Sequence, residues 1–399
     1  MPWRDSTVID DKVKFVQAYD KYVRSDERSM ADLCAEYGIA RKTGYKMIRR
    51  RDEGGWPALG ERSRAPHSGP HWWGSEVVAH VLGIRLEFAH WGAETILSYL
   101  QRNDPEVSWP SASTIHGWLK HAELVERSTR RRRYPHPGKP AQPALERANQ
   151  QWSVDFKGHF RTRDRRYCYP LTVADSFSRY LIGCQGLTST TFEQVWPVFE
   201  RLFRQYGLPE SILSDNGTPF SSNSVKRLSR LSVRWIRLGI VPVLTQPGKP
   251  QQNAQHERMH GHMKGLVCSA PSANCREQQK QFDWFENHYN HVRPHASLDK
   301  KVPADLYTSS PRSWPARLPA LEYPPHFQSR RVRSSGEIKW HGQWFFLSDS
   351  LVGEMVAFEP VADGCWILRF GPIELGLYSA HDRNLHLDRP RPGGKAENA

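Results

Sequence analysis

The chain has 399 residues, 38% of them hydrophobic, and a formal net charge of +14. This length predicts several domains rather than one core, and the charge favours a polyanion such as nucleic acid as the partner. We find no apolar run long enough to cross a bilayer and no secretory leader, so we expect a cytoplasmic protein with no membrane partner.

The six cysteines are scattered and form no Cys-x-x-Cys pair. This spacing argues against a structural zinc site and against a disulfide framework. We expect inert thiols in a reducing compartment.

Residues 12–51 have the pattern of helices, and we assign residues 1–65 to a DNA-binding domain. Within it, Ser29–Ile48 resembles a helix-turn-helix in which Gly38 supplies the left-handed turn. Its small core is expected to contain Leu33, Tyr37, Ile39, Tyr45 and Ile48.

The second helix of this domain is strongly basic, which suits a helix that lies in a major groove. Helical hairpins with a glycine turn also occur without a DNA role, so the arginine density decides in favour of DNA contact. Ala40 stands where serine or threonine would cap this helix. The basic residues follow one another with no intervening acid: Arg41, Lys42, Lys46, Arg49, Arg50 and Arg51.

A second helical domain is expected over residues 70–126. Its predicted helices are Val77–Phe88, Ala93–Leu100 and Pro110–Lys120, the last with a serine near its start. They suggest a second helix-turn-helix-like unit with a less one-sided charge.

Residues 127–148 then read as an extended basic linker, and a solvated tether and a DNA contact are compatible roles for it. Its predicted DNA contacts are Arg130, Arg131, Arg132 and Arg133.

From residue 149 the pattern changes to strands that alternate with helices. Three adjacent strands followed by this alternation predict a mixed sheet with helices on both faces. The expected strands are 151–156, 167–174, 180–187, 211–214 and 240–245. The expected helices are 191–206, 224–238, one that begins at Pro250, and 275–291. Residues 325–385 read as all-β and predict a small barrel. The expected strands flank a hairpin turn at His341-Gly342 and continue over 355–360, 365–370 and 374–379.

Three acids stand in distinctive contexts in the central region: Asp155, Asp215 and Glu257. Magnesium prefers oxygen ligands, and sites open to phosphates often use only a few carboxylates. Three acids that converge on two metal ions could hold both the attacking and the leaving oxygen of a phosphodiester displacement.

Four motifs together resemble the bacterial insertion-sequence transposases of the DDE superfamily, which are related to retroviral integrases. They are Trp152-x-x-Asp155-x-x-Gly158, Asp215-Asn-Gly-Thr-Pro-Phe220, Pro247-Gly-Lys-Pro-Gln-Gln-Asn253 leading to Glu257, and Tyr289-Asn-His-Val-Arg-Pro-His-Ala-Ser-Leu298.

This resemblance implies an α/β RNase H-like catalytic core over residues 149–310, between all-α helix-turn-helix units and the β-barrel. It implies that Asp155, Asp215 and Glu257 bind two Mg²⁺ ions, for which Mn²⁺ can substitute, and form the catalytic triad. The implied reactions are hydrolysis at the element's ends and strand transfer. The implied partners are double-stranded DNA (terminal repeats and target) and further copies of the chain on DNA, in a bacterial cytoplasm at the nucleoid.

Other residues near the acids have weaker assignments. Asn253, Glu257 and Lys264 share a helix face by their spacing, so Asn253 could orient DNA or Glu257, and Lys264 could hold a phosphate. Lys249 is a further predicted DNA contact. His159, Asp175 and His260 are candidates for secondary roles, although a structural role is the simpler expectation. Ala254 and Gly261 depart from the family pattern and raise the question of an inactive copy. Alanine is strained if position 254 needs a left-handed backbone, and Gly261 is expected to break the helix shortly after Glu257.

Two other functions stay open. A catalytically inactive DNA-binding protein or repressor could retain this core, although drift would readily remove one of the three acids. A ribonuclease of the same fold would not need two N-terminal DNA-reading units and a basic linker.

Overall fold

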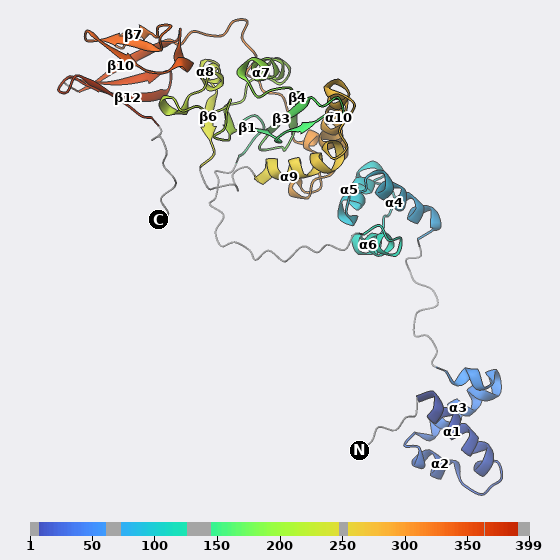
Figure 1. Cartoon of the computed structure of the whole chain (residues 1–399). Helices are drawn as coiled ribbons and strands as arrows, with labels where there is room; N and C mark the ends of the chain where they lie inside the picture. The colour runs from blue at the N-terminus through green and yellow to red at the C-terminus, as the bar shows by residue number, and fades with distance from the viewer. Residues whose placement is uncertain (1–7, 61–72, 126–144, 247–253, 363, 390–399) are drawn as a thin grey trace. The chain divides into compact units, whose positions relative to one another are not determined.

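The computed structural model describes residues 8–60, 73–125, 145–246, 254–362 and 364–389 (Figure 1). The chain divides into two compact units, Met1–Gly74 and Ser75–Ala399. Among these described residues, no helix has both the length and the apolar character needed to cross a bilayer.

The first unit is helical, as the sequence predicts. It contains α1 (Val8–Ala18), α2 (Met30–Glu36) and α3 (Arg41–Gly54). Gly38 lies between α2 and α3 with φ +63°, which confirms the left-handed turn.

The predicted core of this unit is wrong at one position. Leu33 and Ile48 are buried, but Tyr45 is 55% exposed. Gly44 faces the interior instead, because a Cβ there would lie 2.7 Å from the Met30 side chain. One residue further along a helix the side chain points about 100° away, so Tyr45 faces solvent.

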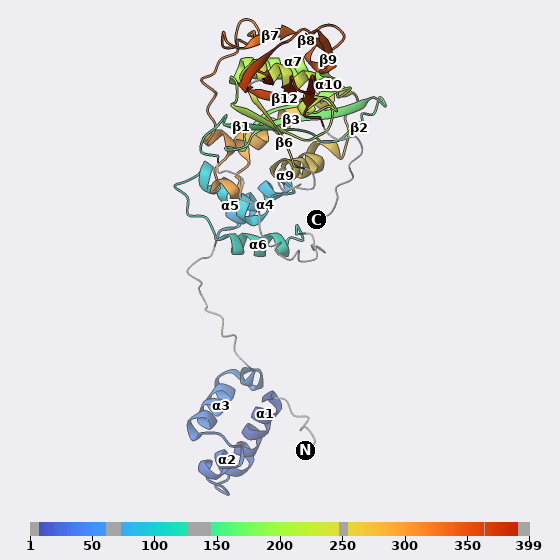
Figure 2. The same cartoon turned by 90° about the vertical axis from the view of Figure 1, so that its left-hand side faces the viewer.

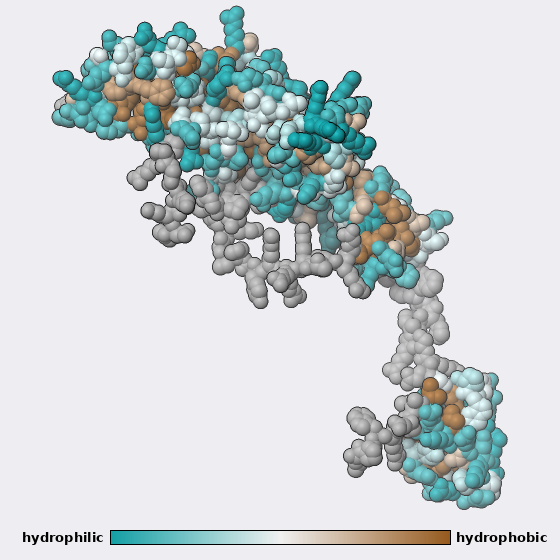
Figure 3. All heavy atoms as spheres, in the orientation of Figure 1, coloured by the Kyte–Doolittle hydropathy of each residue, from teal (hydrophilic) through white to brown (hydrophobic). Residues whose placement is uncertain are grey.

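The second unit begins with three helices that have a small core of their own. They are α4 (Ser75–Glu87), α5 (Ala93–Asn103) and α6 (Ala112–His121), close to the predicted ranges. The Ser111 hydroxyl caps α6 by accepting a hydrogen bond from the Thr114 amide. Figure 3 shows apolar residues gathered on the visible face of these helices. Leu86 of α4 is 68% exposed.

The central domain contains the predicted mixed sheet. Strands β1 (Gln151–Phe156), β3 (Tyr167–Asp175) and β4 (Leu181–Leu187) are antiparallel neighbours, with β3 in the middle. On the other side of β1, β5 (Ser211–Ser214) and β6 (Val241–Leu244) run parallel to it. A two-residue strand, β2 (Phe160–Arg161), pairs with the start of β3. This is the strand arrangement of an RNase H-like fold.

Helices cover both faces of this sheet (Figures 1 and 2). On one face, α7 (Phe192–Tyr206) and α8 (Arg230–Arg237) pack against Trp152, Val154 and their neighbours. On the other face lie α9 (Ala254–Met263) and α10 (Cys275–Asn287), whose apolar residues contact Cys184. The two faces have separate sets of apolar residues, because successive residues of a strand point to opposite sides of the sheet.

The helix predicted over residues 224–238 is shorter than expected. Residues 225–227 form a single tight turn in which Lys226 has φ +51°. The helix begins only after Ser229, whose hydroxyl accepts the Ser232 amide while the Ser232 hydroxyl accepts the Ser229 amide. This capping box fixes the start of α8.

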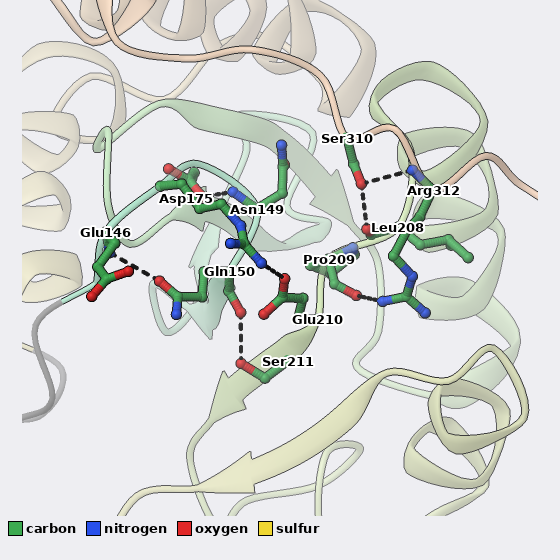
Figure 4. Close-up of polar contacts among 11 residues, drawn as sticks. Glu146, Asn149, Gln150, Asp175, Leu208, Pro209, Glu210, Ser211, Ser310 and Arg312 are labelled. Atoms are coloured by element: carbon green, nitrogen blue, oxygen red, sulfur yellow. Dashed lines mark hydrogen bonds and ion pairs between the residues drawn. The ribbon is translucent and has the colours of Figure 1, made fainter.

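A segment after the core's last helices returns to the amino-terminal ends of β1 and β5 (Figure 4). Ser310 donates a hydrogen bond to the Leu208 carbonyl at 2.7 Å, and Arg312 donates one to the Pro209 carbonyl at 2.6 Å. The Ser211 hydroxyl donates to the Gln150 carbonyl at 3.0 Å. These bonds fix the strand ends opposite Asp155 and Asp215.

The C-terminal region is all-β, but the predicted small barrel is wrong. Its main sheet has five antiparallel strands in the order β13-β12-β11-β10-β7, and β8 and β9 form a separate hairpin. Among the described residues the edge strands β7 and β13 do not pair. Instead, Trp340 of the hairpin stacks on Phe358 of the sheet at 3.7 Å between ring centroids. The strands are β7 (Gln328–Arg331), β8 (Glu337–Trp340), β9 (Gln343–Phe346), β10 (Met355–Ala362), β11 (Cys365–Phe370), β12 (Ile373–Ser379) and β13 (Asn384–Leu387).

Candidate active site

Two of the three predicted acids are neighbours at the carboxyl ends of parallel strands. Ser153 of β1 pairs with Leu213 of β5, so Asp155 and Asp215 each lie two residues further along. Adjacent strands are about 4.8 Å apart. Both carboxylates are partly exposed. The fold therefore places two hard oxygen ligands side by side at one edge of the sheet.

The turn after β5 is built around Asp215. The Gly217 amide donates a hydrogen bond to Asp215 Oδ1 at 3.1 Å, and a Cβ at Gly217 would lie only 3.1 Å from the same carboxylate. Asn216 donates to the Thr245 carbonyl at 2.7 Å and accepts from Arg227 at 2.8 Å. Arg227 is therefore a positioning residue, and no motif in the sequence predicts this role.

Helix α9 is fixed to the sheet through a buried polar cluster centred on Thr172. His256 Nδ1 lies 2.9 Å from the Ser153 hydroxyl, and its Nε2 lies 3.0 Å from Thr172 Oγ1. His260 Nε2 lies 2.8 Å from the same oxygen. Thr172 in turn donates to the backbone carbonyl of Asp155 at 3.0 Å. These four contacts are mutually compatible if Nε2 of each ring donates to Thr172 and the Ser153 hydroxyl donates to His256 Nδ1.

Both histidines of this cluster are neutral near pH 7. Burial lowers the pKa of His256 to about 4. Burial, followed by the charges of His256 and Lys157, lowers the pKa of His260 to about 2. His260 Nδ1 lies 3.9 Å from Asp155 Oδ2. Because the ring is neutral, this contact is not an ion pair, and we assign His260 a positioning role.

Glu257 lies on the exposed side of α9, next to His256. The described residues contain no group of three side chains already close enough to hold a metal ion. The acids therefore fit magnesium in chemical type, and Asp155 and Asp215 also fit it in placement. Glu257 is on the helix that packs against the Asp155 face, but it is not gathered into a ligand cluster.

Two of the secondary candidates have other surroundings. Asp175 is 1% exposed, and its carboxylate accepts a hydrogen bond from the Asn149 amide (Figure 4). It also accepts hydrogen bonds from the amide and the hydroxyl of Ser178. Burial raises the pKa of Asp175, although these hydrogen bonds act to lower it. His159 is exposed and contacts the Tyr167 ring. Asp175 therefore has a structural role at the carboxyl end of β3, where it pairs with Trp152 near the start of β1.

The predicted DNA contacts are partly described. On α3, Arg41, Lys42, Lys46 and Arg49 are exposed and Arg50 is half-buried. Arg51 instead pairs with Asp20 at 2.7 Å. Lys264 is exposed at the end of α9. The remaining contacts lie outside the described residues: Arg130, Arg131, Arg132, Arg133, Lys249 and Asn253.

The two departures from the family pattern are compatible with α9. Ala254 is the first residue of the helix, so it needs no left-handed backbone. The helix runs through Gly261 to Met263, so the expectation that Gly261 breaks it is wrong.

Replacing Gly261 with alanine should stabilise the protein by up to about 1 kcal/mol, because a Cβ there meets no atom of the described residues within 4 Å. Gly207→Ala is the matched control of opposite sign. Its φ is +79°, and a Cβ would lie 2.6 Å from the Ser310 carbonyl oxygen. In urea unfolding, Gly261→Ala should have the highest free energy of unfolding, the wild type an intermediate value and Gly207→Ala the lowest. A loss of stability in Gly261→Ala would contradict the helix geometry.

Comparison with known proteins gives a consistent result. The integrase core domain family matches residues 146–250 and 238–303. An uncharacterised 39.2 kDa protein of insertion element IS476 from Xanthomonas euvesicatoria is 28% identical over 206 residues, 51% of this chain and 57% of the relative. An uncharacterised protein of insertion element IS407 from Burkholderia multivorans is 27% identical over 166 residues, 40% of this chain and 55% of the relative. The matches thus span little more than half of these relatives.

Among solved structures, the chain is similar to the HTLV-2 integrase catalytic core domain in complex with magnesium. The identity is 15%, the TM-score is 0.32, and the match covers 41% of this chain and 98% of that one. The chain thus contains an integrase core domain over residues 146–303 and is similar to proteins of two insertion elements, which supports the resemblance to DDE insertion-sequence transposases.

Proposed function

We propose that this chain is a DNA transposase that hydrolyses a phosphodiester at its element's ends and transfers the freed 3′-hydroxyl into target DNA. The observation that carries this proposal is the placement of Asp155 and Asp215 side by side on parallel strands, beneath the helix that bears Glu257. The net charge of +14 and the exposed cations of α3 suit a DNA partner.

Asp155, Asp215 and Glu257 would hold two magnesium ions, for which manganese can substitute. When bound, such ions activate the attacking oxygen and stabilise the leaving one. The protein's own residues position these ligands. The Asp215 turn is fixed through Asn216 and Arg227, and the Thr172 cluster holds α9 against β1. Two element ends must be joined, so we also propose that the chain acts as a homo-oligomer on DNA.

One observation favours a second candidate, a catalytically inactive DNA-binding protein. Among the described residues, the three acids do not form a ready metal-ligand group. DNA binding would then depend on the helical units, with the core retained as a scaffold.

Metal dependence separates these functions. Purified protein should be incubated with labelled duplexes from both flanks of its gene, with magnesium, manganese or a chelator. We expect nicking and joining with either metal and none with the chelator. Sequence-specific binding without cleavage in either metal would favour the inactive protein, and cleavage that survives the chelator would refute the metal-dependent mechanism.

A further inference from the structure

A small pocket beside α9 is strongly cationic. Its volume is about 180 Å³, and its lining includes three arginines, two histidines and a tyrosine: Arg179, Arg258, Arg293, His262, His295 and Tyr289. Arg293 and His295 belong to the Tyr289–Leu298 motif, to which the proposed catalytic mechanism gives no role. Arg258 directly follows Glu257, so the pocket and the third predicted acid share helix α9.

Two of these arginines carry buried nitrogens with unmet hydrogen-bonding capacity. Arg179 Nη1 and Arg293 Nε are buried and have no hydrogen-bond partner among the described residues. Burial lowers the pKa of Arg179. Asp175 acts in the opposite direction, but its carboxylate already accepts three hydrogen bonds from Asn149 and Ser178. A buried cation without a full set of partners costs several kcal/mol, which a bound anion would offset.

The histidines of the pocket add donors without adding charge. Burial, followed by the charge of Arg293, lowers the pKa of His262 to about 4 and that of His295 to about 3. Near pH 7 each ring is therefore neutral and can donate one N–H. His295 Nε2 lies 3.3 Å from the Tyr289 carbonyl, and the two rings are 4.6 Å apart, which fixes the wall of the pocket.

The size and the donors together define the ligand. Pockets for drug-sized molecules typically have roughly 300–1,000 Å³, so this one suits a small group rather than a nucleoside. Guanidinium groups match phosphate oxygens in geometry and charge. We propose that this pocket binds a backbone phosphate of the DNA strand that passes α9 beside Glu257. This inference rests on the proposed DNA transposase function.

The test compares Arg293→Gln and Arg179→Gln with Arg276→Gln, which removes an exposed positive charge from α10. Binding of a labelled duplex is measured by fluorescence anisotropy in a chelator over a range of salt concentrations, so that chemistry plays no part. We expect each pocket variant to bind about tenfold or more weakly than Arg276→Gln. The slope of log Kd against log salt should fall by about 0.9 for each lost phosphate contact.

Thermal unfolding without DNA separates this role from a structural one. Removing an unsatisfied buried cation should leave Tm unchanged or raise it, whereas a structural arginine would lower it. Pocket variants that bind DNA like Arg276→Gln, with the same salt slope, would overturn the proposal. Inorganic phosphate that stabilises the wild type but not Arg293→Gln, with DNA affinity unchanged, would assign the pocket to free phosphate and likewise overturn it. A wild type that binds no DNA would instead refute the proposed function itself.

Discussion

Glu257→Gln should abolish strand cleavage and joining, with a loss of at least about 10³-fold, while DNA binding is retained. The substitution removes one negative charge and one hard oxygen ligand from the proposed metal site. Metal ions contribute several kcal/mol of transition-state stabilisation in such reactions, and each 1.4 kcal/mol is a factor of ten in rate. Because Glu257 is exposed on α9, the change should cost less than about 0.5 kcal/mol of stability.

Single-turnover cleavage of a labelled element end measures the rate, and anisotropy on the same duplex measures binding. Glu94→Gln is the matched control, since Glu94 is also an exposed glutamate in a helix. It should leave the cleavage rate within about twofold of the wild type, because it lies outside the candidate site. Cleavage by Glu257→Gln at the wild-type rate would remove Glu257 from the site and leave Asp155 and Asp215 without their predicted third partner.

The central fold could be predicted because its strands are short apolar runs bounded by turns. The strands 151–156 and 211–214 have the predicted bounds. Strands β2, β7 and β13 were missed, and β7 shows why. Its sequence, Gln-Ser-Arg-Arg, has no apolar residue, and it is a strand only because it pairs with β10. Barrel closure was predicted wrongly for the same reason, since it depends on long-range strand pairing that a local pattern does not contain.

The acids of the candidate site could be found from sequence because each has a distinctive set of neighbours. Their supporting residues could not. His256 contacts Thr172 across 84 positions of the chain, and nothing around either residue predicts the contact. Arg179 and Arg293 meet only through the fold. The Tyr289–Leu298 motif can be recognised in the sequence. The pocket that its side chains line forms only when the fold brings α9 and the β3–β4 turn beside the motif.

Acidification from pH 7 to pH 5 should destabilise the protein, because several histidines are buried in neutral form. Burial is the first cause that lowers the pKa of His288 to about 4 and of His295 to about 3, and the charge of Arg293 adds to it. In the unfolded chain their pKa is about 6.5. A lowered folded pKa means that the unfolded state binds protons first, so stability is complete above pH 6.5 and declines as pH falls toward 4.

Each of these two histidines should contribute a loss on the order of 2 kcal/mol between pH 7 and pH 5. Glu286 acts in the opposite direction, because burial raises its pKa to about 7 and acid relieves the cost of its charge. With His262 added to the two buried histidines, the net effect should still be a loss of stability on acidification. Urea unfolding at pH 7 and pH 5 measures the difference.

His288→Phe should make the protein both more stable and less sensitive to acid. The His288 ring stacks on Trp284 and contacts Phe88 and Trp91, contacts that phenylalanine can keep. Its Nε2 is buried and has no hydrogen-bond partner in the part of the chain that the structure describes, so replacing it by carbon removes an unsatisfied polar atom as well as a titrating group. The same substitution at exposed His116 is the control and should leave the pH dependence as it is in the wild type. If His288→Phe instead kept the full acid sensitivity, the loss of stability on acidification would originate in groups other than His288.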